Sequence, residues 1–249
     1  MCGTSLALSE TDMIQSLSSG MQAQWYRHEV LANNLANVST AGFKQDNLTV
    51  KEGMAEPGPA GTIAAAAHSI NHWTDFSQGA IHETDRPLDV ALSGSGFFVV
   101  QTPAGPRYTR AGALSVNAQG NLVSAGGFQV LGQGGPITVR SPKIVIGPQG
   151  DVQDDGQTVD TLRVVDFPKP YALIKESRGL FVPADVKVAP ETATDYQVVG
   201  GALEESNVNA VRTMVEMIDM LRKYETAQRA IQAEDEAARY ASNDMGRLQ

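Results

Sequence analysis

The sequence predicts an α+β fold, with one helix near each terminus and a central all-β domain between them; each helix has one apolar stripe that could pack against the other helix or against other chains. Two observations predict this arrangement. Apolar residues recur at every third or fourth position near both ends of the 249-residue chain, which is the spacing of a helical seam. Turn residues recur about every 8–12 positions in the middle, as in small β domains. A Pro/Gly/Ala-rich stretch, EPGPAGTIAAAAHS, separates the first helical zone from the β zone.

These patterns divide the chain into five segments. The expected segments are 1–12 as a possible extension or misassigned start, 13–44 as the N-terminal helix, 45–84 as a linker or extended region, 85–200 as the central β domain, and 201–249 as the C-terminal helix that pairs with the first. The stretch before Met13, MCGTSLALSETD, contains no recognised motif.

The N-terminal helix is expected to pack through a narrow apolar seam. The residues at seam spacing are Ile14, Leu17, Met21, Leu31, Leu35 and Val38. Gln24 and His28 interrupt this seam, and Gly20 costs about 1 kcal/mol relative to alanine within a helix. Such a helix needs a partner.

The C-terminal helix repeats the same rhythm through Met214, Met217, Leu221, Tyr224 and Ile231. We expect packing between helices or between subunits to use Val215, Ile218, Leu221 and Tyr224. Glu204 and Glu205 precede this zone, where negative charge would favour the start of a helix.

The motif LANNLANVSTAGFK, from Leu31 to Lys44, contains more amides than an ordinary core helix. Asn33, Asn34 and Asn37 are expected to bond the backbone or amides of adjacent helices and so fix their register; the alternative is that they merely end the helix. Gly42 is expected to take a positive φ at the helix exit, with Phe43 packing back against it.

The central zone reads as consecutive short strands joined by turns. Expected turns lie at Pro103–Pro106, Ala118–Asn121, Pro148–Gly150 and Asp155–Gly156. Glycine is frequent, with 24 residues, and aromatic residues make up only 6% of the chain, which favours a turn-rich β region over a dense enzyme core.

Few residues offer catalytic or metal-binding chemistry. His68 and His72 would share one face of a helix, but two solvated histidines are the simpler interpretation. SGSG at Ser93–Gly96 lacks the strand–turn–helix context of a nucleophile elbow, because the strand-like FFVV follows it. Asp154 and Asp155 fit a hairpin turn better than an acid/base pair. We therefore expect no catalytic residue, no metal site and no cofactor.

Composition also limits the partners and the cellular location. A net charge of −9 disfavours binding to nucleic acid or to an anionic membrane surface. Cys2 is the single cysteine, so a disulfide framework is excluded. No stretch approaches the roughly 18 apolar residues of a membrane span, and the first residues lack the pattern of a cleaved signal peptide.

Several motifs, in one order along the chain, resemble the flagellar basal-body rod and hook proteins. They are SGMQAQ (19–24), LANNLANVSTAGFK (31–44), RPLDVALSGSGFFVV (86–100), YTRAGALSVNAQGNLVSAGGFQVLG (108–132) and LEESNVNAVRTMVEMI (203–218). The modest length, RPLDVAL and VLGQGGPITV (130–139) are most similar to the proximal-rod members, and the distal-rod members are the next most similar.

The resemblance implies a structural subunit rather than an enzyme. It implies terminal helices that pair in an antiparallel coiled coil and a β domain packed outside it. It also implies self-association in a helical assembly with other rod and hook proteins, after export through the flagellar type III apparatus into the periplasmic space without signal cleavage.

Two functions of other classes compete with this interpretation. An extracellular carbohydrate-binding β module would expose aromatic side chains on the β domain, but Trp25 and Trp73 both lie outside that zone. A hydrolase would need a nucleophile and a base, and the sequence offers no such set. A hook-type axial protein is the alternative within the family.

Overall fold

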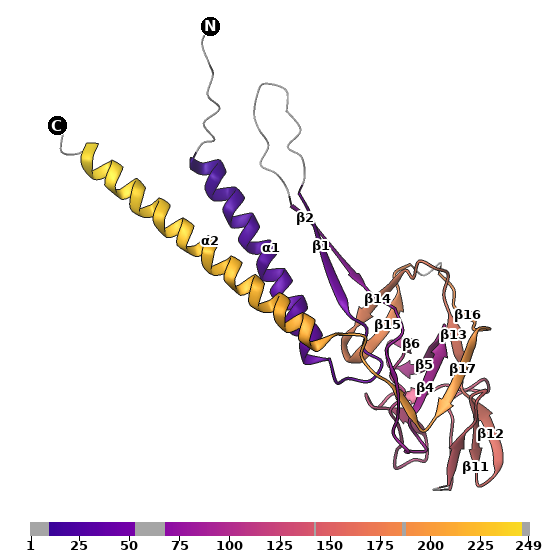
Figure 1. Ribbon diagram of the computed structural model, residues 1–249. Helices are drawn as coiled ribbons and strands as arrows, with labels where there is room; N and C mark the ends of the chain where they lie inside the picture. Colours follow the sequence, from indigo (N-terminus) through magenta and orange to yellow (C-terminus); the bar gives the residue numbers. More distant parts are fainter. Residues whose placement is uncertain (1–9, 53–67, 142, 186–187, 246–249) are drawn as a thin grey trace. The chain divides into compact units, whose positions relative to one another are not determined.

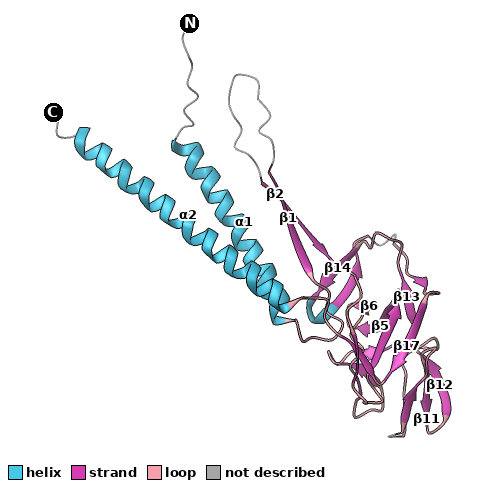
Figure 2. Ribbon diagram, in the orientation of Figure 1, coloured by secondary structure: helices cyan, strands magenta, loops and turns pink. Residues whose placement is uncertain are grey.

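The computed structural model describes residues 10–52, 68–141, 143–185 and 188–245. The chain divides into two compact units. Unit 1 contains residues 1–35, 46–73 and 210–249, and unit 2 contains residues 36–45 and 74–209. Helices dominate unit 1 and strands make up almost all regular structure in unit 2 (Figure 2).

Unit 1 contains two long helices and one two-stranded sheet. Helix α1 spans Glu10–Ala36 and helix α2 spans Ala210–Met245. The two helices are in contact and run in opposite directions (Figure 1). Strands β1 (Asp46–Glu52) and β2 (His68–Thr74) pair with each other. Paired terminal helices around a β region confirm the predicted α+β class.

The buried face of α2 follows a heptad-like spacing. Thr213 and Met220 are buried, and Met217, Tyr224 and Ile231 are half-buried. Met217, Tyr224 and Ile231 belong to the rhythm that the sequence indicated. Among the described residues, no helix is both long enough and apolar enough to cross a membrane.

Unit 2 is built from short strands in several small sheets and one large one. The strands are β3 Ile81–Glu83, β4 Val90–Gly94, β5 Phe97–Thr102, β6 Gly105–Thr109, β7 Leu114–Val116, β8 Leu122–Ser124, β9 Gln129–Val130, β10 Ile144–Ile146, β11 Asp151–Asp154, β12 Gln157–Thr161, β13 Val164–Asp166, β14 Leu173–Glu176, β15 Leu180–Pro183, β16 Glu191–Thr192, β17 Tyr196–Gly200 and β18 Ala202–Glu204. A 3₁₀ turn, Ser177–Gly179, joins β14 to β15.

The large sheet has nine strands, with the order β14-β15-β6-β5-β9-β8-β7, and β13 joins β5 and β16 beside this path. The smaller sheets are β10-β11-β12, β17-β4 and β18-β3. The expected turns are confirmed: Asp155 and Gly156 both have positive φ between β11 and β12, as a type I′ hairpin requires.

Two buried clusters hold unit 2 together. The larger is aliphatic and includes Val90, Leu92, Val100, Leu122 and Ile137. The smaller is aromatic: Phe97, Tyr108, Phe167 and Phe181 meet there, and Phe76 and Tyr171 pack against them. Ring centroids in this cluster lie 4.8 to 6.1 Å apart, mostly edge to face, which is the favoured geometry for aromatic pairs.

The elements begin and end at other residues than the sequence indicated. Helix α1 begins at Glu10, inside the expected extension, and ends at Ala36, eight residues before Lys44. Residues 45–84, expected as a linker, contain β1, β2 and β3, although most of EPGPAGTIAAAAHS lies outside the described residues. Helix α2 begins only at Ala210, because β18 occupies residues 202–204.

Candidate assembly site

One face of α2 exposes large apolar side chains along its first turns. These side chains are 45% to 73% exposed and belong to Val211, Met214, Val215, Ile218 and Leu221. Their spacing of three and four residues places them in one row, about 15 Å long at the helical rise of ~1.5 Å per residue. We call this row the α2 stripe. A contiguous apolar surface rimmed by charges is typical of an interaction site.

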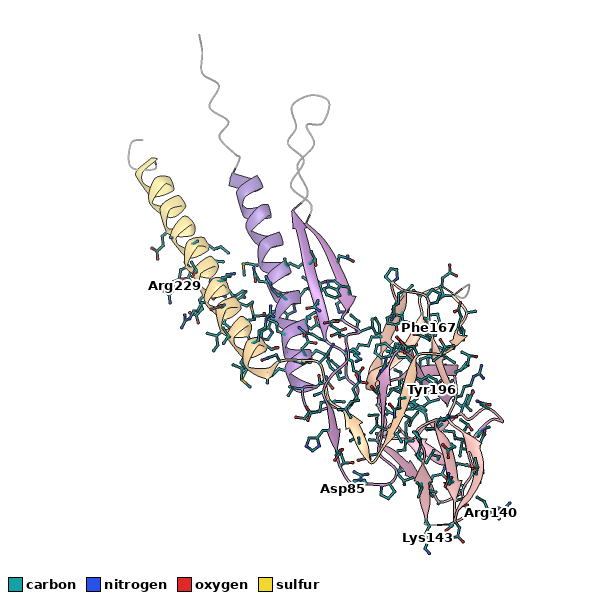
Figure 3. All side chains as sticks on the ribbon, turned by 45° about the vertical axis from the view of Figure 1, so that its right-hand side comes forward. Asp85, Arg140, Lys143, Phe167, Tyr196 and Arg229 are labelled. Atoms are coloured by element: carbon teal, nitrogen blue, oxygen red, sulfur yellow. The ribbon has the colours of Figure 1, made fainter. Side chains whose placement is uncertain are left out.

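Polar residues border the α2 stripe and follow it along the helix. Arg212 and Glu216 form an exposed ion pair with an N···O distance of 3.0 Å. Arg222, Lys223 and Glu225 are exposed after Leu221, and Arg229 is labelled farther along the helix in Figure 3. The apolar surface is thus confined to the part of α2 that begins at its N-terminal end.

The seam residues expected from the sequence occupy different environments. In the N-terminal segment, Leu31 is buried, whereas Met21, Leu35 and Val38 are half-buried, and Val38 follows the end of α1. The side chains of Ile14 and Leu17 lie outside the described part of the structure. In α2, Val215, Ile218 and Leu221 are exposed. Their packing against other helices or subunits remains a prediction.

The asparagines of LANNLANVSTAGFK take separate roles. Asn34 is only 1% exposed, and its side chain bonds the backbone of Asp46 twice: Nδ2 donates to the carbonyl at 2.7 Å, and Oδ1 accepts from the N–H at 2.9 Å. Asn34 therefore ties α1 to the first residue of β1 within the chain, a role the sequence did not indicate. Asn33 is exposed on α1.

Asn37 lies in the turn that follows α1. The backbone N–H of Thr40 donates to the Asn37 carbonyl at 3.0 Å, and the Thr40 hydroxyl lies 3.2 Å from Asn37 Oδ1. This local geometry matches the alternative in which Asn37 helps to end the helix.

Gly42 has a φ of +68°, which confirms the expected positive φ after the helix. A Cβ at this position would lie 2.4 Å from the backbone N of Ala111, far inside van der Waals contact. Only glycine fits both the conformation and the space. Phe43 is buried next to it, and the Lys175 ammonium lies 3.5 Å from the centre of the Phe43 ring.

Lys44, two residues after Gly42, belongs to a cluster in which one buried carboxylate lies between two cations. Glu204 and Lys44 are 0% exposed and Arg110 is 4% exposed. Glu204 Oε1 lies 2.5 Å from Lys44 Nζ, and Glu204 Oε2 lies 3.3 Å from Arg110 Nη1. The three residues lie in unit 2 but come from distant parts of the chain. Together with Asn207, which lies three residues after Glu204, we call them the root cluster.

Backbone groups form further hydrogen bonds with this cluster. Lys44 Nζ donates to the Ser77 carbonyl at 2.7 Å, and Arg110 Nη2 donates to the Gly94 carbonyl at 2.7 Å. The Gly79 N–H donates to Glu204 Oε1 at 3.1 Å. Burial lowers the pKa of Lys44, and the adjacent Glu204 carboxylate opposes that shift.

Asn207 binds the segments on either side of the β1–β2 sheet. Its Oδ1 accepts from the Gln45 N–H at 2.7 Å. Its Nδ2 donates to the Asp75 carbonyl at 2.9 Å and lies 3.2 Å from the Ser77 carbonyl. One side-chain amide thus joins the residue before β1 to the residues after β2.

The sequence patterns do not reveal this cluster. They predict that Glu204 lies at the N-terminus of a helix, but Glu204 belongs to β18, and the first turn of α2 contains no acidic residue. The available signal was a charge within each of three otherwise mostly uncharged motifs: one in GFK, one in TRAG and the adjacent pair Glu204–Glu205 in LEESN. Periodicity alone does not reveal which of these charges meet.

The candidate chemical sites do not assemble. His68 and His72 lie on strand β2 rather than on a helix, where positions four apart are separated by about 13 Å. Ser93 and Gly94 end strand β4, and Ser95 and Gly96 connect it to β5; both glycines have positive φ. Asp154 accepts hydrogen bonds from the backbone N–H groups of Arg140 and Ser141 at 2.7 and 3.0 Å.

Comparison with known proteins identifies three matched segments. Residues 14–44 match the family described as "Flagella basal body rod protein", residues 91–157 match "Flagellar hook protein FlgE/F/G D1 domain", and residues 199–244 match "Flagellar basal body rod FlgEFG protein C-terminal". The flagellar basal-body rod protein FlgF of Caulobacter vibrioides is 30% identical over 226 residues, covering 88% of this chain and 92% of that protein.

The chain belongs to the flagellar basal-body rod family. It is a structural, non-enzymatic protein of the basal-body rod. Membership in this family implies assembly with other rod and hook proteins. Each of the three matched segments contributes to the root cluster: Lys44 comes from the first, Arg110 from the second, and Glu204 and Asn207 from the third.

Other relatives are similarly distant. The FlgG rod protein of Buchnera aphidicola, from the pea-aphid strain, is 31% identical over 253 residues, covering 90% of this chain and 97% of that protein. The hook-basal body complex protein FlhO of Bacillus subtilis is 28% identical over 266 residues, covering 94% of this chain and 98% of that protein.

Replacing Gly42 with valine should destabilise unit 2 by at least ~1–3 kcal/mol, because a β-branched residue is strained at positive φ and its Cβ meets the backbone of Ala111. Chemical denaturation monitored by far-UV circular dichroism measures the loss in the free energy of unfolding. Gly127→Val is the matched control, since Gly127 has a φ of +81° but open space around its Cβ position. Equal losses in the two variants would contradict a cost from the close approach.

Glu204→Gln and Lys44→Met should differ in their effect on stability. The glutamine variant leaves two buried cations without a carboxylate, which costs about 3–5 kcal/mol. The methionine variant leaves Glu204 paired with Arg110. It also removes a buried ammonium: burial lowers the pKa of Lys44, so the cost of taking this charge out of water offsets part of its attraction to Glu204. Denaturation at neutral pH should give a clearly smaller loss for Lys44→Met; an equal loss would argue that Lys44 is the main partner of Glu204.

Proposed function

We propose that the protein is a subunit of the proximal rod, which polymerises through its terminal helices into the drive shaft that transmits torque to the hook. The observation that carries the polymerisation is the α2 stripe. A row of five large apolar side chains left in water is costly, at about 25 cal/mol per Å² of apolar surface. Contact with a neighbouring subunit would remove that surface from water.

Alignment lengths support the proximal position. The FlgF alignment spans 226 positions for 88% of this chain, whereas the FlgG alignment spans 253 positions for 90%. The FlgG relative therefore needs more insertions relative to this chain. Its identity of 31% keeps the distal rod as the second candidate.

Partners and location follow from the same proposal. The neighbours are further copies of the chain and other rod and hook-basal-body proteins, arranged in a helical assembly through heterologous contacts that do not close. The subunit reaches the periplasmic space through the flagellar type III export apparatus without a cleaved signal peptide. These statements rest on family membership.

Ile218→Asp should abolish incorporation into the rod while leaving unit 2 folded. Ile218 is 50% exposed, so an aspartate there costs the free chain little, but it would place an unpaired charge in an interface. Gln228→Asp introduces the same charge at an exposed position beyond the α2 stripe and should assemble normally. The readout is the amount of the protein in purified basal bodies; wild-type incorporation of Ile218→Asp would reject the α2 stripe as the contact.

Deletion of the gene should leave basal bodies without a rod or hook in electron micrographs, and the wild-type gene should restore both. A distal subunit would instead leave the base of the rod in place when it is lost. Intact rods in the deletion strain would reject the structural function altogether. Binding of the purified protein to purified neighbouring rod proteins then identifies its position in the stack.

A further inference from the structure

The chain passes between unit 1 and unit 2 four times, after residues 35, 45, 73 and 209. These passages lead from α1, into β1, out of β2 and into α2. On the unit 2 side, the adjoining segments are 36–45, 74–80 and 204–209. All three segments meet in the root cluster, although up to about 160 positions separate them.

Backbone hydrogen bonds join these segments pairwise. The Gly42 N–H donates to the Glu204 carbonyl at 2.7 Å. The Asp75 N–H donates to the Gln45 carbonyl at 2.8 Å, and the Glu205 N–H donates to the Ala80 carbonyl at 2.7 Å. Each of the three segments is therefore hydrogen-bonded to the other two where the chain passes from unit 2 to unit 1.

Side chains anchor the joined segments to the β structure. Arg110 binds the carbonyl of Gly94 at the end of β4. The Gln78 amide donates to the Leu92 carbonyl at 3.1 Å and accepts from the Gly94 N–H at 3.1 Å. The cluster is thus bonded on one side to the chain passages and on the other to strand β4.

The Asn207 side chain bonds both of the other segments. It precedes α2, accepts a hydrogen bond from the residue before β1, and donates to the residues after β2. A single covalent connection can rotate about its φ and ψ angles within the allowed regions. Connections that are bonded to each other side by side cannot swivel independently.

We propose that the root cluster is a torsional clamp: it holds the unit 2 ends of the four chain passages together as one body, so that no passage can twist independently of the others. Asn207 acts as a positioning residue in this clamp. The inference rests on the proposed rod function, because only a subunit that carries torque requires such a coupling.

Hydrogen exchange of the purified full chain tests the clamp directly. In Asn207→Ala, amides in 42–45, 75–80 and 204–207 should exchange about tenfold faster or more, with the rest of unit 2 unchanged. Asn207→Asp keeps the acceptor for the Gln45 N–H and loses the two donations, so acceleration should be confined to 75–80. Asp154→Ala is the matched control: Asp154 is half-buried like Asn207, and the substitution removes a side chain that accepts hydrogen bonds from the backbone N–H groups of Arg140 (labelled in Figure 3) and Ser141, in another sheet. Unchanged exchange in Asn207→Ala would overturn the proposal.

Swimming under load gives the functional readout. Cells that carry Asn207→Ala should form rods and swim at a normal speed in dilute medium, but lose at least half of the speed that Asp154→Ala cells keep in a viscous medium. Equal speeds in viscous medium, or absence of rods with both Asn207 variants, would overturn the clamp. The proposed function fails separately, if the deletion strain retains its rods.

Discussion

The arrangement of unit 2 depends on one buried carboxylate. Glu204 neutralises Lys44 and Arg110 where solvent does not reach, and each of the three would be costly to bury without the others. Because the three belong to different parts of the chain, satisfying this charge requires that the exit from α1, the strand region and the approach to α2 converge at one place. The close approach of Gly42 to the backbone of Ala111 is a consequence of that convergence.

The two units differ in how completely they bury their own apolar side chains. Unit 2 has an aliphatic and an aromatic core, and its polar segments are bonded to each other. Unit 1 buries Leu31, Thr213 and Met220 but leaves the α2 stripe in water. A structural subunit of a filament needs this contrast: one part holds its own shape, and the other is completed by neighbours.

Local patterns in the sequence predicted the local structure. Helical spacing predicted both terminal helices, and Asp155–Gly156 and Gly42 predicted a hairpin and a positive φ that the structure contains. The predicted helix boundaries were wrong where tertiary contacts determine the structure. The Asn34 side chain bonds the backbone of Asp46, and Glu204 is the last residue of strand β18 rather than a residue at the start of a helix. The root cluster was beyond reach because an isolated lysine, arginine or glutamate in a sequence is normally a solvated side chain, and no periodicity links residues 44, 110 and 204.

The bond between Lys44 and Glu204 also orders events in time. It joins residues that are 160 positions apart, so the root cluster cannot be completed until nearly the whole β region is available to fold. Contacts of such sequence separation form late, since the entropy of closing the loop must be met first. Whichever end of the chain becomes available first must wait for the other. The root cluster is therefore among the last features of unit 2 to form, after the strands to which it is bonded.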